Sequence, residues 1–333
     1  MYKPQPKLTI GLPVYNGEKL LEQALDCLLN QTFSDFELII CDNASTDNTE
    51  EICRNYAAQD ARIIYYRNPY NIGCACNFNR VFKLAQGEYF KWASYDDLHA
   101  PNFLSKCIQV LEENPDYVLC HSHTYFIDEQ GNFLKTYDIK LNTDSEKPEV
   151  RFTELLTKHL CYQMYGVFRT SVLAKVPPMG GYGTADGVFL HRLGMIGKFY
   201  EIPEYLFFAR CHPQQSMSMY FPDYLSFTEN DPEYSVDTFP DFYEYSVWFD
   251  SSKKGKILFP HWRILTENIR SIVQSKLSFQ QQLSCYLGIV EKLAGTESLL
   301  LQDIVVAIQQ FKKRLEKSPT TKNGEYVQQY SRN

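Results

Sequence analysis

The sequence lacks the segments that mark a secreted or membrane-spanning protein. Its first six residues contain no apolar core of a signal peptide, and no stretch approaches the roughly 18 uncharged apolar residues of a membrane span. The net charge is −7, with acidic and basic residues mixed along the chain. No basic stripe is therefore present for a nucleic-acid backbone. We expect a cytoplasmic protein, at most peripheral to a membrane, that does not bind nucleic acid.

Two glycine-rich phosphate-binding motifs are also missing. The chain has neither G-x-G-x-x-G nor G-x-x-x-x-G-K-[ST], which argues against a dinucleotide site and a P-loop. Ten cysteines are present, but they are scattered through apolar segments of a 333-residue chain, which predicts reduced core thiols rather than a disulfide framework. Cys74 and Cys76 form the one close pair, and packing is the better interpretation than zinc binding.

Apolar runs and helical patterns alternate along the first hundred residues. We expect strands at 8–14, 36–41, 63–66 and 89–93, and helices at 18–29, 47–58 and 77–85. Asp47 and Glu50 are spaced as a capping box for the second helix. Repeated alternation of this kind predicts an α/β fold, with a parallel sheet covered by helices on both faces.

A polar loop follows each of the four expected strands. These loops are Tyr15-Asn16, residues 42–47, residues 68–73 and residues 94–97. In parallel sheets the ligand lies beyond the carboxyl ends of the strands, where such loops converge. The sequence therefore predicts one ligand site built from all four loops.

The motifs in these loops resemble those of family 2 glycosyltransferases. The matching segments are 12–16, 40–49, 68–73, 84–89, and Tyr95-Asp96-Asp97 with Pro101. The likeness is close over 7–125 and looser over 160–216. It implies a GT-A fold with a mostly parallel central sheet, a nucleoside-diphosphate sugar donor, a divalent cation (Mn²⁺ or Mg²⁺) and a reaction that inverts the anomeric centre.

The resemblance also implies a set of nucleotide-binding residues. Asp42 would accept a hydrogen bond from a uracil- or thymine-type base, and the remaining contacts would come from Pro13, Tyr15, Asn16, Asn71, Tyr95, Asp96 and Arg210. Tyr15 offers a ring face on which a base or ribose can pack. The alternative is that the segment 42–47 merely forms a capped turn before a helix.

The implied metal ligands are Asp96, Asp97 and His212. Carboxylates and imidazole suit a divalent cation that neutralises a diphosphate. Ser94 stands where relatives usually carry a further acid, and Phe78 stands where many carry an arginine. The alternative for Asp96 and Asp97 is an acidic pair that stabilises the start of a helix.

The later catalytic region contains one candidate general base. An inverting transfer needs a base that takes the proton of the attacking hydroxyl, and Asp186 matches the family's acidic residue before a helix. Relatives commonly have a second acid where this chain has Ala185. The alternative is that Asp186 only caps the helix. His121 and His123 share one face of an expected strand at 117–124, and we interpret them as packed or solvent-facing rather than metal-binding. Residues 134–150 are polar, and we expect a loop there.

The C-terminal third is a separate region in this interpretation. We expect a GT-A catalytic domain at 1–218 (donor side 7–125, acceptor side 150–218), an aromatic linker with helices at 219–318, and a disordered tail at 319–333. Helical patterns cover 261–276, 279–293 and 297–316. The aromatics of 220–250 suit a sugar platform or, preferably, ordinary core packing. The last helix is amphipathic, which leaves open a membrane contact or a homodimer.

The sequence thus predicts a glycosyltransferase that uses a UDP- or dTDP-type donor. The acceptor would be a saccharide or a lipid-linked molecule in polysaccharide or glycoconjugate biosynthesis. Because Ser94, Phe78 and Ala185 each replace a group that relatives use, a catalytically silent protein that binds sugar nucleotides or glycans is the competing hypothesis.

Overall fold

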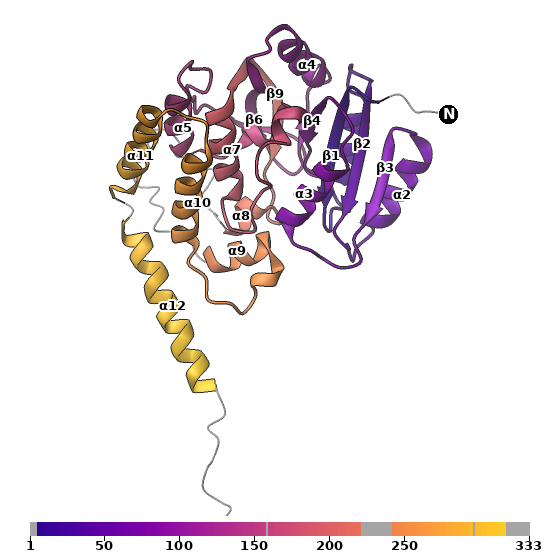
Figure 1. The fold of residues 1–333 in the computed structure, drawn as a ribbon. Helices are drawn as coiled ribbons and strands as arrows, with labels where there is room; N and C mark the ends of the chain where they lie inside the picture. The colour runs from indigo at the N-terminus through magenta and orange to yellow at the C-terminus, as the bar shows by residue number, and fades with distance from the viewer. Residues whose placement is uncertain (1–4, 158, 221–241, 296, 318–333) are drawn as a thin grey trace, which may run out of the picture.

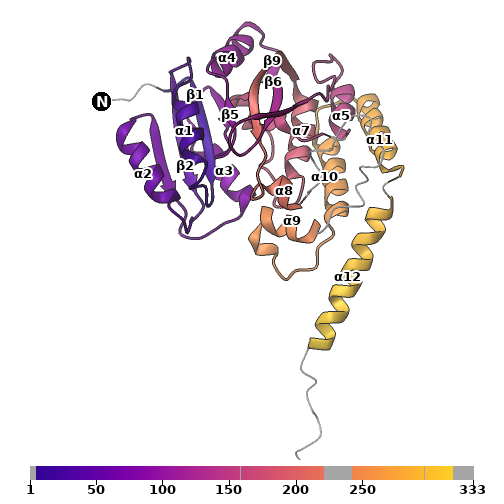
Figure 2. The same ribbon diagram turned by 180° about the vertical axis from the view of Figure 1, so that it is seen from behind.

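One nine-stranded sheet organises the chain, and helices cover both of its faces (Figures 1 and 2). The structure, a computed structural model, describes residues 5–157, 159–220, 242–295 and 297–317. The predicted disordered tail at 319–333 and residues 221–241 of the aromatic segment lie outside the described residues.

The first half of the sheet is parallel and follows the predicted alternation. Its strands are β1 (Leu8–Val14), β2 (Phe36–Asp42), β3 (Ile63–Arg67) and β4 (Tyr89–Trp92), in the order β3-β2-β1-β4. They are connected through α1 (Leu21–Leu29), α2 (Thr49–Gln59) and α3 (Cys74–Leu84). Every residue of β1 and β2 is buried, which is why these strands are continuous apolar runs in the sequence.

The second half of the sheet mixes directions. Its strands are β5 (Leu98–His99), β6 (Tyr117–Ile127), β7 (Phe133–Tyr137), β8 (Val167–Arg169) and β9 (Lys198–Arg210). β8 runs antiparallel between β4 and β6, whereas β9 lies parallel to β6. Its helices are α4 (Phe103–Glu113), α5 (Pro148–Leu156), η1 (Tyr162–Tyr165), α6 (Thr170–Leu173), α7 (Ala185–Ile196) and α8 (Ser216–Tyr220). The predicted α/β class with a mostly parallel central sheet is confirmed.

Alternation along the strands divides the core into two layers. Leu38 and Ile40 of β2 face the layer formed with α1 and α4, while Ile39 and Cys41 face the layer formed with α3 and α7. Trp92 lies in the second layer, with its ring edge-on to Phe90, Phe168 and Phe189. All ten cysteines are free thiols; five are buried, but Cys76 is exposed and is not a core residue.

The helices at the C-terminal end are α9 (Phe242–Phe249), η4 (Ser251–Lys253), α10 (Pro260–Gln274), α11 (Phe279–Leu293) and α12 (Glu297–Lys317). A third core cluster joins α10 and α11 to α5 and α7. Arg192 of α7 and Glu267 of α10 form a buried ion pair at 2.7 Å. The three long predicted helices are confirmed. Within the described residues, no helix is both long and apolar enough to cross a membrane.

Two local predictions were wrong. The segment 134–150, expected to be a loop, contains most of β7 and the start of α5. The capping box of Asp47 and Glu50 does not form, because the N-cap of α2 is Asn48. Instead, the Asp47 carboxylate accepts hydrogen bonds from the backbone N–H groups of Thr49 and Glu18, each at 3.1 Å. Asp47 therefore joins the loop after β1 to the start of α2.

Candidate functional site

The loops after β1 and β2 are fastened to each other at the carboxyl edge of the sheet. The Asn16 N–H donates to the Ser45 hydroxyl at 2.9 Å, and the Thr46 N–H donates to Asn16 Oδ1 at 2.8 Å. Asn16 has φ 53° and Ala44 has φ 62°, the left-handed conformation that asparagine tolerates better than most residues. Beside this junction Tyr15 is 43% exposed. A rigid loop pair thus presents a tyrosine ring to solvent.

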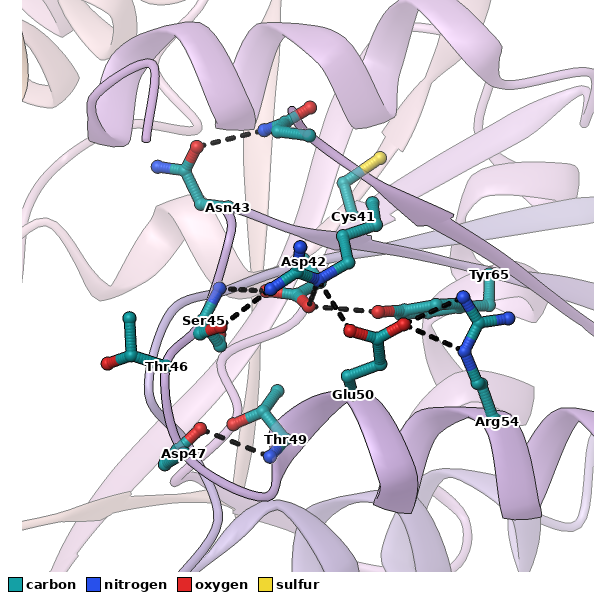
Figure 3. Close-up of polar contacts among 12 residues, drawn as sticks. Cys41, Asp42, Asn43, Ser45, Thr46, Asp47, Thr49, Glu50, Arg54 and Tyr65 are labelled. Carbon is teal, nitrogen blue, oxygen red and sulfur yellow. Dashed lines mark hydrogen bonds and ion pairs between the residues drawn. The ribbon is translucent and has the colours of Figure 1, made fainter. Parts of the chain in front are cut away.

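Asp42 ends β2 and is the centre of a hydrogen-bond network (Figure 3). Its Oδ1 accepts the N–H of Ser45 at 2.8 Å, and its Oδ2 accepts the Tyr65 hydroxyl at 2.9 Å and Arg67 Nε at 3.2 Å. The side chain is completely buried. Three of the roughly four acceptor positions of a carboxylate are therefore occupied by protein donors, and one on Oδ1 remains.

Arg67 covers Asp42 from the solvent side and was not identified from the sequence. Its side chain is 35% exposed; it also contacts Glu50 at 2.8 Å and donates to the Ser45 carbonyl at 2.7 Å. Glu50 in turn pairs with Arg54 at 2.7 Å. The signal for Arg67 is positional, because it is the last residue of β3 and lies in register with Asp42.

The loop after β3 is ordered by side-chain amides. Asn43 Nδ2 donates to Asn71 Oδ1 at 2.9 Å, and the N–H of Gly73 donates to the same oxygen at 2.9 Å. Asn68 Nδ2 donates to Asn43 Oδ1 at 2.9 Å. Asn71 is exposed on the rim of the loop, so the structure places it at the edge that contains Asp42.

Asp96 and His212 form a buried pair beyond β4 and β9. His212 Nε2 lies 2.9 Å from Asp96 Oδ2, and each residue is 5% exposed. The Ser94 hydroxyl donates to Asp96 Oδ1, so the serine that replaces the expected acid orients the acid that remains. The Tyr95 ring stands edge-on to the His212 ring, with centroids 6.5 Å apart.

Asp97 and Arg210 contact each other and the loop that holds Asp96. The Arg210 N–H donates to Asp97 Oδ1 at 2.9 Å, and burial and the neighbouring Asp96 raise the pKa of Asp97 well above its usual range. The Arg210 guanidinium is fully buried and donates to the Asp96 carbonyl at 2.7 Å, the Glu129 carbonyl at 2.6 Å and Gln23 Oε1 at 3.0 Å. Asp97 Oδ1 and the Arg210 guanidinium therefore have partners within the protein, and the roles of Asp97 as a metal ligand and Arg210 as a phosphate contact stay predictions. Both residues hold the Asp96 loop against the end of β9.

His121 and His123 of β6 lie beside Glu201 of β9. His121 Nδ1 lies 3.8 Å and His123 Nε2 lies 3.6 Å from the Glu201 carboxylate. Across the ranges that the structure describes, no three His, Cys, Asp or Glu side chains stand together as a metal-binding group. The packed interpretation of these histidines agrees with this arrangement.

Asp186 is the second residue of α7, after a Thr184 N-cap with φ 59°. Its Oδ1 accepts the N–H of the adjacent Gly187 at 2.9 Å, and burial raises the pKa of Asp186. The residue is therefore not the N-cap of α7. A raised pKa is typical of an acid that accepts a proton during a reaction.

Tyr165 and Tyr245 are two tyrosines whose pKa values are affected by the charge of Asp186, and they were not identified from the sequence. Burial raises the pKa of Tyr165 well above its usual range, and the charges of Asp97, Asp96 and Asp186 add to the effect. Burial and the charge of Asp186 likewise raise the pKa of Tyr245 on α9. Tyr165 thus lies within electrostatic range of both acidic groups.

The α9–η4 segment closes one side of the site. A Cβ on Gly73 would lie 2.9 Å from the Phe249 carbonyl oxygen, and a Cβ on Gly181 would lie 2.7 Å from Asp250 Cβ. Tyr245 and Phe249 are buried in the core. For Tyr245 and Phe249 of the aromatic segment, core packing is therefore the observed role. The segment contacts both the loop after β3 and the loop before α7.

Known proteins share this sequence pattern and this fold. The model of "Glycosyl transferase family 2" matches residues 9–176. A glycosyltransferase of Methanocaldococcus jannaschii is 34% identical over 157 residues, which are 46% of this chain and 54% of the relative. One of Haemophilus influenzae is 36% identical over 142 residues, 43% and 54% of the two chains. The chain thus spans about half the length of these relatives.

A solved structure resembles nearly the whole chain. It is Staphylococcus aureus TarS, residues 1–349, in complex with UDP-GlcNAc, with a TM-score of 0.60, 16% identity, and coverage of 93% of this chain and 83% of TarS. At this identity the likeness shows the fold alone. The family model covers half of the chain and includes the Asp42 network and the Asp96 loop. The chain therefore belongs to glycosyl transferase family 2.

Proposed function

We propose that this chain transfers a sugar from a UDP- or dTDP-type donor to a hydroxyl of a saccharide or lipid-linked acceptor, with inversion, in polysaccharide or glycoconjugate synthesis. The observation that carries the proposal is the Asp96–His212 pair at 2.9 Å, located at the sheet edge that also holds the Asp42 network. One part of this edge suits a base, and the other suits a metal and a diphosphate.

The base would bind at Asp42. A uracil or thymine ring presents an N–H beside a carbonyl, and Asp42 Oδ1 retains one acceptor position while Arg67 supplies N–H donors. Because Asp42 is covered, the base reaches it when the half-exposed Arg67 moves aside or joins the contact. Exposed Tyr15 provides a ring face nearby.

Asp96 and His212 would hold Mn²⁺ or Mg²⁺. Their side chains meet at 2.9 Å, which brings a carboxylate oxygen and an imidazole nitrogen together at one point of the sheet edge. One carboxylate and one imidazole leave positions for diphosphate oxygens and water, as Mg²⁺ usually requires. When bound, the cation would stabilise the negative charge that develops on the leaving diphosphate.

Asp186 would act as the general base. The acceptor oxygen attacks the anomeric carbon, its bond to that carbon forms while the bond to the diphosphate oxygen breaks, and Asp186 takes the hydroxyl proton. Attack opposite the leaving group inverts the anomeric centre. The raised pKa of Asp186, caused by burial, suits a group that must accept this proton.

The test is release of nucleoside diphosphate from a panel of donors, with Mn²⁺ and with EDTA. The panel contains UDP-glucose, UDP-galactose, UDP-GlcNAc, dTDP-glucose and GDP-mannose. We expect metal-dependent release from a UDP or dTDP donor. Preference for GDP-mannose would overturn the base assignment, and full activity in EDTA would overturn the metal. Tight donor binding without release, even with added oligosaccharide acceptors, would favour the silent binding protein.

A further inference from the structure

Helix α12 is attached to the body by one face. The Asp303 carboxylate accepts the backbone N–H groups of His261 at 2.8 Å and Trp262 at 3.2 Å, at the start of α10. The Trp262 indole N–H donates to the Leu300 carbonyl at 3.0 Å. Leu299 and Ala307 on the same face are buried. The helix is therefore held in place although it extends away from the sheet (Figure 1).

The opposite face of α12 is apolar and exposed. It carries Leu301, Ile304, Ile308, Phe311 and Leu315, which are 63%, 38%, 50%, 54% and 61% exposed. Their spacing alternates between three and four residues over two heptads, which is the spacing of a helix that packs along another helix. Most exposed large apolar side chains of the described residues lie between 259 and 315. Such a concentration marks a contact surface.

We propose that this stripe pairs α12 with α12 of a second copy of this chain, in antiparallel orientation. The two ends of the helix carry opposite charges, with Glu297 at the start and the basic residues Lys312, Lys313 and Arg314 near the end. Antiparallel pairing about a two-fold axis near Ile304 places Glu297 of one helix beside Lys312 of the other. It also opposes the two helix dipoles favourably.

Charge argues for a second copy over a lipid surface. A helix that lies on an anionic membrane carries Lys and Arg along its polar face. The polar residues in the first two thirds of α12 are uncharged or acidic, including Gln302, Asp303 and Gln309. The chain as a whole has a net charge of −7, which anionic lipid would repel.

Sedimentation velocity of the full chain from about 1 to 100 μM tests the proposal. We expect a concentration-dependent dimer, and Ile308→Glu should raise its dissociation constant at least about 10²-fold, because an unpaired charge would be buried in the stripe. Gln309→Glu adds the same charge to an exposed position beside the stripe and should leave the dimer intact. Unchanged circular dichroism and melting temperature would show that both variants fold.

Charge exchange tests the orientation. Glu297→Lys and Lys312→Glu should each raise the dissociation constant a few-fold, roughly the effect of exposed ion pairs, and the double variant should restore it. A wild-type chain that stays monomeric at 100 μM, an Ile308→Glu variant that still dimerises, or a double variant that is weaker than either single one would overturn the proposal. The proposal would also be overturned if the wild-type monomer floats with vesicles that contain phosphatidylglycerol and the Ile308→Glu variant does not.

Discussion

Asp42 and Asp186 are two acids at opposite sides of the site, and their surroundings differ. Asp42 accepts hydrogen bonds from Ser45, Tyr65 and Arg67. Asp186 accepts one, from the amide of the next residue, and burial raises its pKa. The donors around Asp42 hold its side chain in one position, whereas the raised pKa of Asp186 favours uptake of a proton. This contrast is the basis for proposing Asp42 as a binding group and Asp186 as a reacting group.

The strongest test of this contrast is Asp186→Asn. Because Asn cannot take the acceptor proton, turnover should fall by about 10²–10⁴-fold, while UDP affinity stays nearly the same. Asp116→Asn, which changes an exposed acid, is the matched control and should keep its turnover. Turnover and UDP calorimetry on the same preparations check this. Retained turnover in Asp186→Asn would remove the residue as the base.

The pH dependence of Asp186 gives a second readout of the same variant. Since the base must be ionised, the acidic limb of wild-type turnover should lie above the usual aspartate range. The folded state also holds this proton more tightly than the unfolded chain does, so wild-type stability falls as pH rises through that window. Asp186→Asn should therefore melt no lower than wild type at pH 7, with any advantage lost in acid. A markedly lower melting temperature at pH 7 would indicate a structural role.

The next largest effect should come from Asp96→Asn. Loss of the proposed metal ligand should lower transfer by at least about 10²-fold and weaken donor binding in Mn²⁺. Asp97→Asn is the matched comparison, because its amide oxygen can still accept the Arg210 N–H. We expect Asp97→Asn to change metal-dependent binding by less than about tenfold. Equal losses in the two variants would support Asp97 as a second ligand.

A smaller effect is expected at the base pocket. Asp42→Ala should weaken UDP binding by about 1–3 kcal/mol, the usual cost of losing a charged hydrogen-bond partner. Tyr65→Phe removes one donor to the same carboxylate and should mainly lower stability, by roughly 1 kcal/mol. Calorimetry with UDP and thermal melting separate the two. An unchanged UDP affinity in Asp42→Ala would mean that Asp42 only shapes its loop.

The smallest effect on turnover should come from Gly181→Ala, on the loop before α7. Its new Cβ would lie 2.7 Å from Asp250 Cβ, so η4 must shift, at a cost of about 1–3 kcal/mol in the free energy of unfolding. UDP affinity should stay unchanged, because the loop lies on the side of Asp186. Thermal melting and UDP calorimetry check this. A melting temperature equal to that of wild type would show that the α9–η4 segment does not pack tightly there.

The sequence was most informative where local pattern and burial coincide. β1 and β2 are buried throughout and appear as unbroken apolar runs, and the capping box Ser278–Gln281 begins α11 at its predicted position. β8 was missed because its three residues are a strand only through pairing with β4 and β6 on either side. Short strands that depend on distant partners carry little local signal.

The distinction between local sequence pattern and contacts between distant residues also applies to the site. The loops holding Asp42, Asp96 and Asp186 could be recognised, since each follows or precedes a regular element. The direction of a long side chain could not be predicted, and Arg210 is the example. Its guanidinium donates to the Asp96 carbonyl inside the protein, and its backbone N–H donates to Asp97, 113 residues earlier in the chain. Motif spacing indicates which residue types are present, but packing decides what each contacts.

Strand order has a consequence for how the site is assembled during synthesis. β1 to β4 pair with strands near them in the chain, so the Asp42 network can form once the first hundred residues are available. Contacts of high sequence separation form late because loop closure must precede them. Asp96, Asp97, Arg210 and His212 meet only when β9 has joined the sheet. We therefore expect the Asp42 network to form first in the nascent chain, while the corner that holds Asp96 and His212 needs residues up to 212.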